Sequence, residues 1–288
     1  IRDSFSRRCC QHNHAQGWPY FTEHLVLATP DNGVATAIYA ACKATVKVGD
    51  GKEITLHEET NYPFEEGIAF TVSTDEKVAF PFYLRIPSWT QKVEVRVNGK
   101  KVSAAPVAGK YLCINREWAN GDLVELPLPM SLSMRTWQVN KNSVSVDYGP
   151  LTLSLKIAEK YVEKDSRETA IGDSKWQKGA DSKKWPTTEI YPVSRWNYSL
   201  VLDKKEPLKN FKVIRKSWPA DNYPFTVASV PLEVKAIGRP VPEWKIDETG
   251  LCGVLPEEDA VKGDKEEITL IPMGAARLRI SAFPNTKE

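Results

Sequence analysis

Short runs in which apolar and polar residues alternate dominate the chain from Val34 onward, and such alternation is typical of β-strands. In the clearest run, residues 93–97, valines alternate with charged residues and lead directly into Asn98-Gly99. An Asn-Gly pair after such a run strongly indicates a β-hairpin. The pattern recurs at Ala35–Val48, Glu53–Leu56, Ile68–Val72, Val78–Ile86 and Leu123–Leu128. Many short strands with polar turns favour an antiparallel sandwich of jelly-roll type over parallel βαβ units.

A second group of strand-like segments begins near Ser143. Residues 144–155 predict two strands about Gly149-Pro150, and the later segments with the same pattern are Tyr198–Leu202, Phe211–Ile214, Leu232–Ile237, Glu267–Leu270 and Ala276–Ala282. Between Glu159 and Thr188 the chain is polar and rich in lysine, which predicts a long surface excursion. The fold class we expect is mainly β, with two antiparallel, jelly-roll-like β-sandwich domains at residues 31–140 and 141–288.

The first thirty residues follow a different pattern. Trp18, Phe21, Leu25 and Ala28 recur at spacings of three and four residues, which predicts a helix. Tyr20 and Leu27 add apolar side chains on its other faces, so a single helix of this kind cannot bury itself. We therefore expect residues 1–30 to be a short helical remnant, the last part of a helical domain, ended by turn residues at Thr29–Gly33.

Composition and charge narrow the class of protein. The 288 residues are 41% hydrophobic and 26% charged, close to the average of globular proteins, which excludes a disordered, collagen-like or coiled-coil chain. Lys plus Arg at 39 nearly balance Asp plus Glu at 37, so charge indicates neither nucleic acid nor anionic lipid as a partner. No apolar run approaches the roughly 18 residues of a membrane span. The charged start IRDSFSRRCC suggests that a leader has been removed or that the chain is a piece of a longer protein.

One local arrangement calls for a chemical explanation. Cys9 and Cys10 are adjacent and follow Arg7-Arg8, and neighbouring guanidinium groups lower a thiol pKa and favour the reactive thiolate. Adjacent cysteines can also bind one zinc ion, although two ligands do not complete such a site. On spacing alone they could equally be incidental thiols. The nearby histidines, His12, His14 and His24, are more often surface or hydrogen-bonding residues than ligands. Cys42, Cys113 and Cys252 are each expected to be a buried free thiol.

Other candidate groups are less specific. Adjacent carboxylates on a strand point to opposite faces, so pairs such as Glu58-Glu59 and Glu65-Glu66 are expected to be solvated rather than an acid and base pair. Tryptophans can stack on sugar rings, although core packing explains most of them. The ones considered are Trp89, Trp118, Trp176, Trp185, Trp196 and Trp244.

An ordered series of motifs is more specific than any single one. The series comprises RRCCQHN at Arg7–Asn13, YPFEEG at Tyr62–Gly67, FYLRIPSW at Phe82–Trp89, VEVRVNGK at Val93–Lys100, INREWANGD at Ile114–Asp122, VDYGPL at Val146–Leu151 and LIPMGAARLRISAFP at Leu270–Pro284. Together these motifs cover nearly the whole chain. The series resembles the C-terminal region of the bacterial β-L-arabinofuranosidase family, glycoside hydrolase family 127 and its relatives.

The resemblance implies a fold and a chemistry. Members have an (α/α)6 barrel followed by β-sandwiches, which would make residues 1–30 the remnant of that barrel. It also implies that Cys9 is a zinc-bound nucleophile and Cys10 a further zinc ligand, in a retaining hydrolysis that passes through a glycosyl-cysteine. A second pair of zinc ligands, Cys and Glu, and a separate acid/base Glu would come from upstream segments. We therefore expect this chain alone to be inactive and to hold zinc weakly.

The resemblance leaves specificity and location open. Active arabinofuranosidases usually carry an Arg where this chain has Gln16, a difference that bears on sugar specificity. The expected substrate is an arabinofuranose-containing plant-type glycan. The periplasm or cell surface would suit such a protein. Two alternative functions are considered besides the hydrolase. One is a carbohydrate-binding module that uses exposed tryptophans such as Trp176 and Trp185. The other is a purely structural pair of sandwiches that packs on the missing helical domain.

Overall fold

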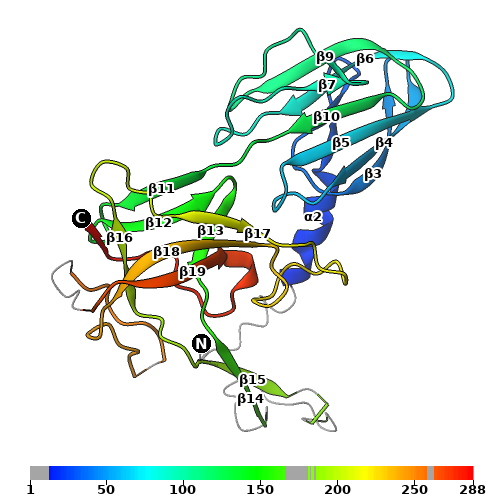
Figure 1. Cartoon of the computed structure of the whole chain (residues 1–288). Helices are drawn as coiled ribbons and strands as arrows, with labels where there is room; N and C mark the ends of the chain where they lie inside the picture. The colour runs from blue at the N-terminus through cyan, green and yellow to red at the C-terminus, as the bar shows by residue number, and fades with distance from the viewer. Residues whose placement is uncertain are drawn as a thin grey trace. The chain divides into compact units, whose positions relative to one another are not determined.

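The computed structural model describes residues 13–165, 181, 183–184, 186–248, 250–257 and 263–287. Contacts divide these residues into two compact units, one at residues 13–131 and the other from Leu132 onward. Figure 1 shows that strands form most of each unit, which confirms the mainly β fold class. Among the described helices, none combines the length and apolar character needed to cross a membrane.

The first unit contains two sheets. The four-stranded sheet has the order β1-β2-β6-β9, and its strands are β1 (Val26–Ala28), β2 (Val34–Thr36), β6 (Val78–Arg85) and β9 (Tyr111–Trp118). The six-stranded sheet has the order β3-β4-β5-β10-β7-β8, with β3 (Cys42–Val48), β4 (Lys52–Thr60), β5 (Gly67–Thr74), β10 (Leu123–Pro127), β7 (Arg96–Val97) and β8 (Lys100–Lys101). Ladders are antiparallel except β2 with β6, which is parallel.

Alternation in the sequence produces the core of the first unit. Along β6 the burial pattern alternates strictly, so that one face of the strand is buried and the other is half-exposed or exposed. Buried side chains from both sheets form one cluster, whose largest members include Trp118, Phe70, Phe80, Phe82, Leu56 and Leu84. Phe70 and Phe82, from different sheets, meet edge to face with ring centroids 5.4 Å apart. Burial of these aromatic and aliphatic faces is the main stabilising contribution.

The hairpin predicted at Asn98-Gly99 is confirmed. Asn98 and Gly99 have φ values of 50° and 73°, the positive values that a tight turn of this kind requires. Asn98 also donates a hydrogen bond from Nδ2 to Asp122 Oδ1 at 2.7 Å, and its Oδ1 accepts one from the Leu123 N–H at 2.8 Å. The turn is therefore tied to the neighbouring strand β10.

The helical prediction near the N-terminus is partly wrong. A 3-10 turn η1 (His14–Gln16) leads into α2 (Gly17–Glu23), but Val26–Ala28 forms β1 instead of the end of a helix. Leu25 is buried, whereas Trp18 and Tyr20 on α2 are exposed in the described part of the chain. Whether residues 1–30 belong to an (α/α)6 barrel stays a prediction.

The second unit contains a single large sheet. Its order is β11-β12-β13-β19-β18-β16-β20, with β17 also paired to β18. The strands are β11 (Leu132–Trp137), β12 (Ser143–Tyr148), β13 (Leu151–Leu155), β16 (Tyr198–Leu202), β17 (Lys212–Arg215), β18 (Leu232–Pro240), β19 (Glu266–Pro272) and β20 (Asn285–Lys287), and the 3-10 turn η3 (Met273–Ala275) follows β19.

The sheet of the second unit curls so that β12, near one end of the strand order, meets the segment just before β20 at the other end. Val144 in β12 forms an antiparallel bridge with Phe283, which lies just before β20 at the far end of the strand order. The two backbone hydrogen bonds of this bridge measure 2.8 and 2.9 Å. Every residue of β12 and β16 is buried, because both faces of these strands are covered. The second unit is thus one curled sheet, whereas the sequence predicted a sandwich; the jelly-roll connectivity stays a prediction.

A two-stranded hairpin accompanies this sheet where the sequence predicted a surface excursion. Strand β14 (Glu159–Lys164) pairs with β15 (Thr187–Pro192), and in Figure 1 the pair extends away from the curled sheet. The contact division begins the second unit at Leu132, nearer the N-terminus than the predicted boundary at residue 141. The domain ranges 31–140 and 141–288 remain predictions.

Candidate functional site

The predicted nucleophile and metal ligands, Cys9 and Cys10, lie outside the described residues. Gln16, at the position where the resemblance expects an arginine, is exposed at the start of α2. The imidazole Nδ1 of His24 lies 2.6 Å from the Tyr20 carbonyl oxygen, so His24 has the hydrogen-bonding role expected of an ordinary surface histidine. His12 is not described either.

No alternative metal centre occurs in the described ranges. Within residues 13–287, apart from the undescribed gaps, no three His, Cys, Asp or Glu side chains converge as ligands. Cys42, Cys113 and Cys252 are free thiols as predicted, but Cys42 and Cys113 are half-buried and Cys252 is exposed, so the prediction of full burial is wrong for them. Cys252 lies in an irregular segment that the apolar sequence pattern did not distinguish from a strand.

The most perturbed carboxyl group of the described chain is Glu58. It lies on β4 with 1% of its surface exposed, and burial raises its pKa to about 8. The Cys42 thiol on β3 donates toward Glu58 Oε2 at 3.9 Å, and Glu58 Oε1 has no hydrogen-bond partner. The prediction that Glu58 is solvated is wrong, because it points into the sandwich. A carboxyl enclosed in this way has no access to a substrate, which excludes it as a catalytic acid.

Two of the sequence motifs meet in the first unit. Tyr62 of YPFEEG packs edge to face on Tyr39, with ring centroids 5.9 Å apart. Arg85 of FYLRIPSW lies above the Tyr39 ring at 5.6 Å, and its backbone carbonyl accepts a hydrogen bond from the Tyr39 hydroxyl. Burial of the Tyr62 ring raises the pKa of its hydroxyl, and the nearby Arg85 charge acts in the opposite direction. These motifs therefore specify a half-buried aromatic cluster around one guanidinium group.

The motif INREWANGD has a structural role. Trp118 is fully buried and donates a hydrogen bond from Nε1 to the Phe80 carbonyl oxygen at 3.0 Å. Asp122 Oδ2 accepts a hydrogen bond from the Ala119 N–H at 2.9 Å, and Asn120 Oδ1 accepts one from the Thr74 N–H at 3.2 Å. These bonds fix the turn before β10, so this motif marks the fold rather than a site.

Of the six tryptophans considered from the sequence, the four that the structure describes are buried or half-buried, which favours core packing over sugar stacking. Trp118 and Trp244 are buried, and Trp244 packs edge to face on Trp196 with ring centroids 5.2 Å apart. Trp89 and Trp196 are half-buried. Trp176 and Trp185, the two on which a binding module would depend, lie outside the described residues.

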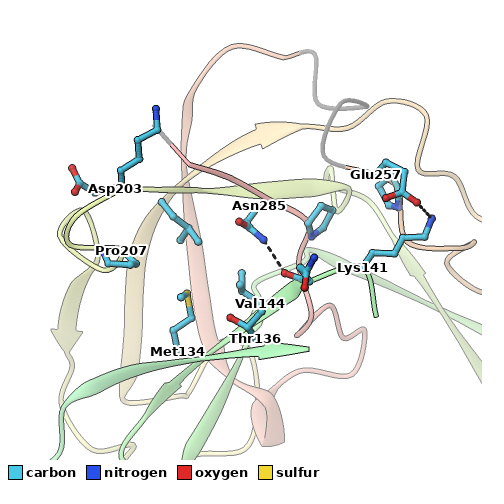
Figure 2. A pocket seen from close by; sticks show the side chains of 13 residues that line it. Met134, Thr136, Lys141, Val144, Asp203, Pro207, Glu257 and Asn285 are labelled. Carbon is cyan, nitrogen blue, oxygen red and sulfur yellow. Dashed lines mark hydrogen bonds and ion pairs between the residues drawn. The ribbon is translucent and has the colours of Figure 1, made fainter. Parts of the chain in front are cut away.

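A cavity of about 550 Å³ opens in the second unit (Figure 2). Its lining comes from the turn between β11 and β12, from both of those strands, from the segment after β16, from the start of β20 and from Pro256-Glu257. The volume lies inside the range of roughly 300–1,000 Å³ that is typical of ligand sites. Sequence reasoning missed it, because these segments are far apart along the chain.

Both apolar and polar groups line this cavity. Val144, Leu202 and Pro284 are buried and form an apolar part of the lining. Asn285 lies among the polar groups and donates from Nδ2 to the Asn142 carbonyl oxygen at 3.0 Å (Figure 2). Lys141 forms an ion pair of 2.7 Å with Glu257, which the same view shows. The cavity thus offers fixed polar groups beside an apolar surface.

Comparison with known protein families gives a match within the first unit. Residues 33–130 match the family described as Beta-L-arabinofuranosidase, GH127 middle domain. This segment is a domain related to the GH127 β-L-arabinofuranosidases. The resemblance deduced from the motifs is thereby confirmed, and the GH127-related domain contains the strands of the first unit's two sheets from β2 to β10, but not β1. No curated protein sequence matches the chain.

Solved structures share the fold over nearly the whole chain. A GH127 β-L-arabinofuranosidase from Geobacillus stearothermophilus T6 has 21% identity and a TM-score of 0.63, with 98% of this chain and 38% of that chain covered. A protein described as a glycoside hydrolase has 22% identity and a TM-score of 0.64, with 98% and 40% covered. A GH127 β-arabinofuranosidase has 22% identity and a TM-score of 0.64, with 98% and 39% covered. The GH127-related domain and the second unit together thus span about two fifths of these proteins.

Proposed function

We propose that this chain forms the C-terminal part of a retaining glycoside hydrolase that acts on arabinofuranose-containing glycans through Cys9. The observation that carries the proposal is the GH127 match of residues 33–130, preceded by the adjacent pair Cys9-Cys10. The shared fold with two GH127 enzymes over 98% of the chain supports it. Because the chain spans about two fifths of those enzymes, the helical catalytic domain would come from a longer protein.

The chemistry proposed for Cys9 is a double displacement. The Cys9 thiolate attacks the anomeric carbon, a C–S bond forms, and the glycosidic C–O bond breaks with its electron pair on the leaving oxygen. A glutamic acid from the helical domain gives that oxygen a proton. Water, deprotonated by the same glutamate, then attacks the anomeric carbon and releases the Cys9 thiolate. Two displacements retain the anomeric configuration.

The sequence around Cys9 favours the thiolate form. Arg7 and Arg8 lie next to the cysteine pair, and a nearby cation lowers the pKa of a thiol. When bound, zinc would supply further stabilisation of the thiolate, and Cys9 and Cys10 are the residues of this chain that would hold it. Thiolates are ligands that zinc prefers, but a tetrahedral site needs two more donors. We propose that those two donors belong to the helical domain, as the family resemblance implies.

The test uses an aryl β-L-arabinofuranoside and the protein extended through its helical domain. We expect hydrolysis by the native sequence and loss of about 10³-fold or more in kcat for Cys9→Ser at matched zinc content, since the serine hydroxyl is a much weaker nucleophile. Cys42→Ser is the matched control, because Cys42 belongs to the GH127-related domain, and it should leave kcat unchanged. Full activity in Cys9→Ser would contradict the proposed nucleophile, and no activity in the folded native protein would discard this sugar.

A further inference from the structure

We propose that the cavity of the second unit binds a neutral oligosaccharide. This site lies within one compact unit and uses none of the residues of the cysteine chemistry. Binding at this site can therefore be tested separately from the proposed hydrolase activity. If both proposals hold, the site would assist hydrolysis by holding a glycan chain. The site differs from the tryptophan-based binding considered from the sequence, because its lining among the described residues contains no tryptophan.

The charge of the lining selects the chemical class of the ligand. Two cationic side chains, Lys141 and Lys204, are matched by two carboxylates, Asp203 and Glu257, so the formal charges cancel. A polyanion would be attracted to both ammonium groups but repelled by both carboxylates, and for a polycation the signs are reversed, so the lining gives neither a net attraction. Like-charge contacts of this kind disfavour a charged ligand. A neutral, polar ligand meets neither penalty.

Several polar atoms in the cavity are available to such a ligand. The amide oxygen of Asn285 and the ammonium group of Lys204 have no hydrogen-bond partner among the described residues, and neither does the hydroxyl of Thr136. Asp203 uses Oδ1 to accept the backbone N–H groups of Lys205 and Glu206 at 2.9 and 2.8 Å, which fixes its carboxylate and leaves Oδ2 for a ligand. Donors and acceptors are thus both present, as sugar hydroxyls require.

The apolar lining complements the other surface of a sugar ring. Pro207, Pro256 and Pro284 present rigid aliphatic rings, and Met134 lies between β11 and the rest of the lining in Figure 2. C–H groups of a sugar pack on such surfaces, while its hydroxyls bond to the polar side chains. Lys141 and Asn142, in the turn between β11 and β12, both have a φ of 52°, which non-glycine residues rarely adopt.

Saturation-transfer NMR titrations would test the site, with the full chain carrying Cys9→Ser so that no hydrolysis intervenes. The probes are α-1,5-arabinotriose and cellotriose as neutral trisaccharides and trigalacturonate as the charged one. Binding of either neutral probe, more tightly than trigalacturonate, supports the proposal. Binding of neither, or tighter binding of trigalacturonate, overturns it. Because Cys9 is already replaced, either result leaves the hydrolase proposal to its own test.

Two pairs of variants locate the binding. Lys204→Ala should weaken binding by about 5-fold, while Lys205→Ala, the neighbouring exposed lysine outside the lining, should change it less than about 2-fold. Thr136→Arg fills the cavity and should abolish binding, whereas Gln138→Arg, on the exposed turn outside the lining, should not. Circular dichroism confirms that each variant is folded. Undiminished binding in folded Thr136→Arg would overturn the site.

Discussion

Two buried carboxylates show how local partners decide the state of a side chain. Asp147 on β12 receives hydrogen bonds from Arg135 Nε and Nη2 at 2.6 and 2.8 Å, so its charge is matched. Glu58 on β4 has a thiol at 3.9 Å as its side-chain partner and one oxygen without any. Burial therefore raises the pKa of Glu58 to about 8, and the group is mostly protonated at neutral pH. In the sequence both residues are acids within a strand-like alternating run. The matched charge of Asp147 and the raised pKa of Glu58 could therefore not be predicted from the sequence.

Glu58 makes the stability of the first unit depend on pH. Its pKa rises from 4.5 to about 8 on folding, so its contribution is fully present below pH 4.5 and is lost as the pH rises through about 8. Between these values the loss approaches about 1.4 kcal/mol per pH unit. Glu58→Gln stays neutral, and we expect its stability relative to the native chain to increase with pH. Urea unfolding at pH 5, 7 and 9 measures this change.

The adjacent residue provides the control for that experiment. Glu59 is exposed on the same strand, so Glu59→Gln should leave the pH dependence of unfolding as it is in the native chain. An unchanged pH slope in Glu58→Gln would show that the carboxyl is not the titrating group.

At the scale of elements, strand pairing explains both the successes and the errors of the sequence predictions. The hairpin at Asn98-Gly99 was predictable because turn chemistry and alternation act within a few residues. Strand β1 was not, because Val26–Ala28 becomes a strand by pairing with β2, in the register Val26↔Thr36. The local spacing of Trp18, Phe21 and Leu25 suggests a helix and contains no information about this pairing partner. β-structure of this kind depends more on neighbouring strands than on local preference.

The parallel pairing of β2 with β6 requires a glycine at its entrance. A Cβ on Gly33 would lie 2.2 Å from the carbonyl oxygen of Pro81 in β6, so the backbone would have to move. We expect Gly33→Ala to destabilise the first unit by about 1–3 kcal/mol, the usual cost of overpacking. Gly67→Ala, with no atom within 4 Å of the added Cβ, is the control and should change stability by less than about 0.5 kcal/mol. Thermal unfolding by calorimetry compares the two, and equal losses would contradict the steric explanation.

At the scale of the whole molecule, the sequence predicted family and fold class better than the sites. The motifs sufficed for the family because several of them, such as INREWANGD, contain residues that form the turns and the core of the fold. The cavity of the second unit could not be predicted, since its lining extends from Met134 to Asn285 and is assembled only by the curl of the sheet. Cys9 and Cys10 lie outside the described residues, so their role in a site stays a prediction.

Two separate cores predict that the chain unfolds in two steps. Contacts divide it between Ser131 and Leu132, and each part buries its own hydrophobic residues, including Leu56 in the first unit and Leu270 in the second. Leu→Ala at a fully buried position costs about 2–5 kcal/mol, so each variant should lower one calorimetric transition by roughly 10 °C. Leu56→Ala should shift only the transition of the GH127-related domain, and Leu270→Ala only the other. If both variants shift one shared transition equally, the two units fold as a single cooperative block, because a loss in either core would then be distributed over the whole chain.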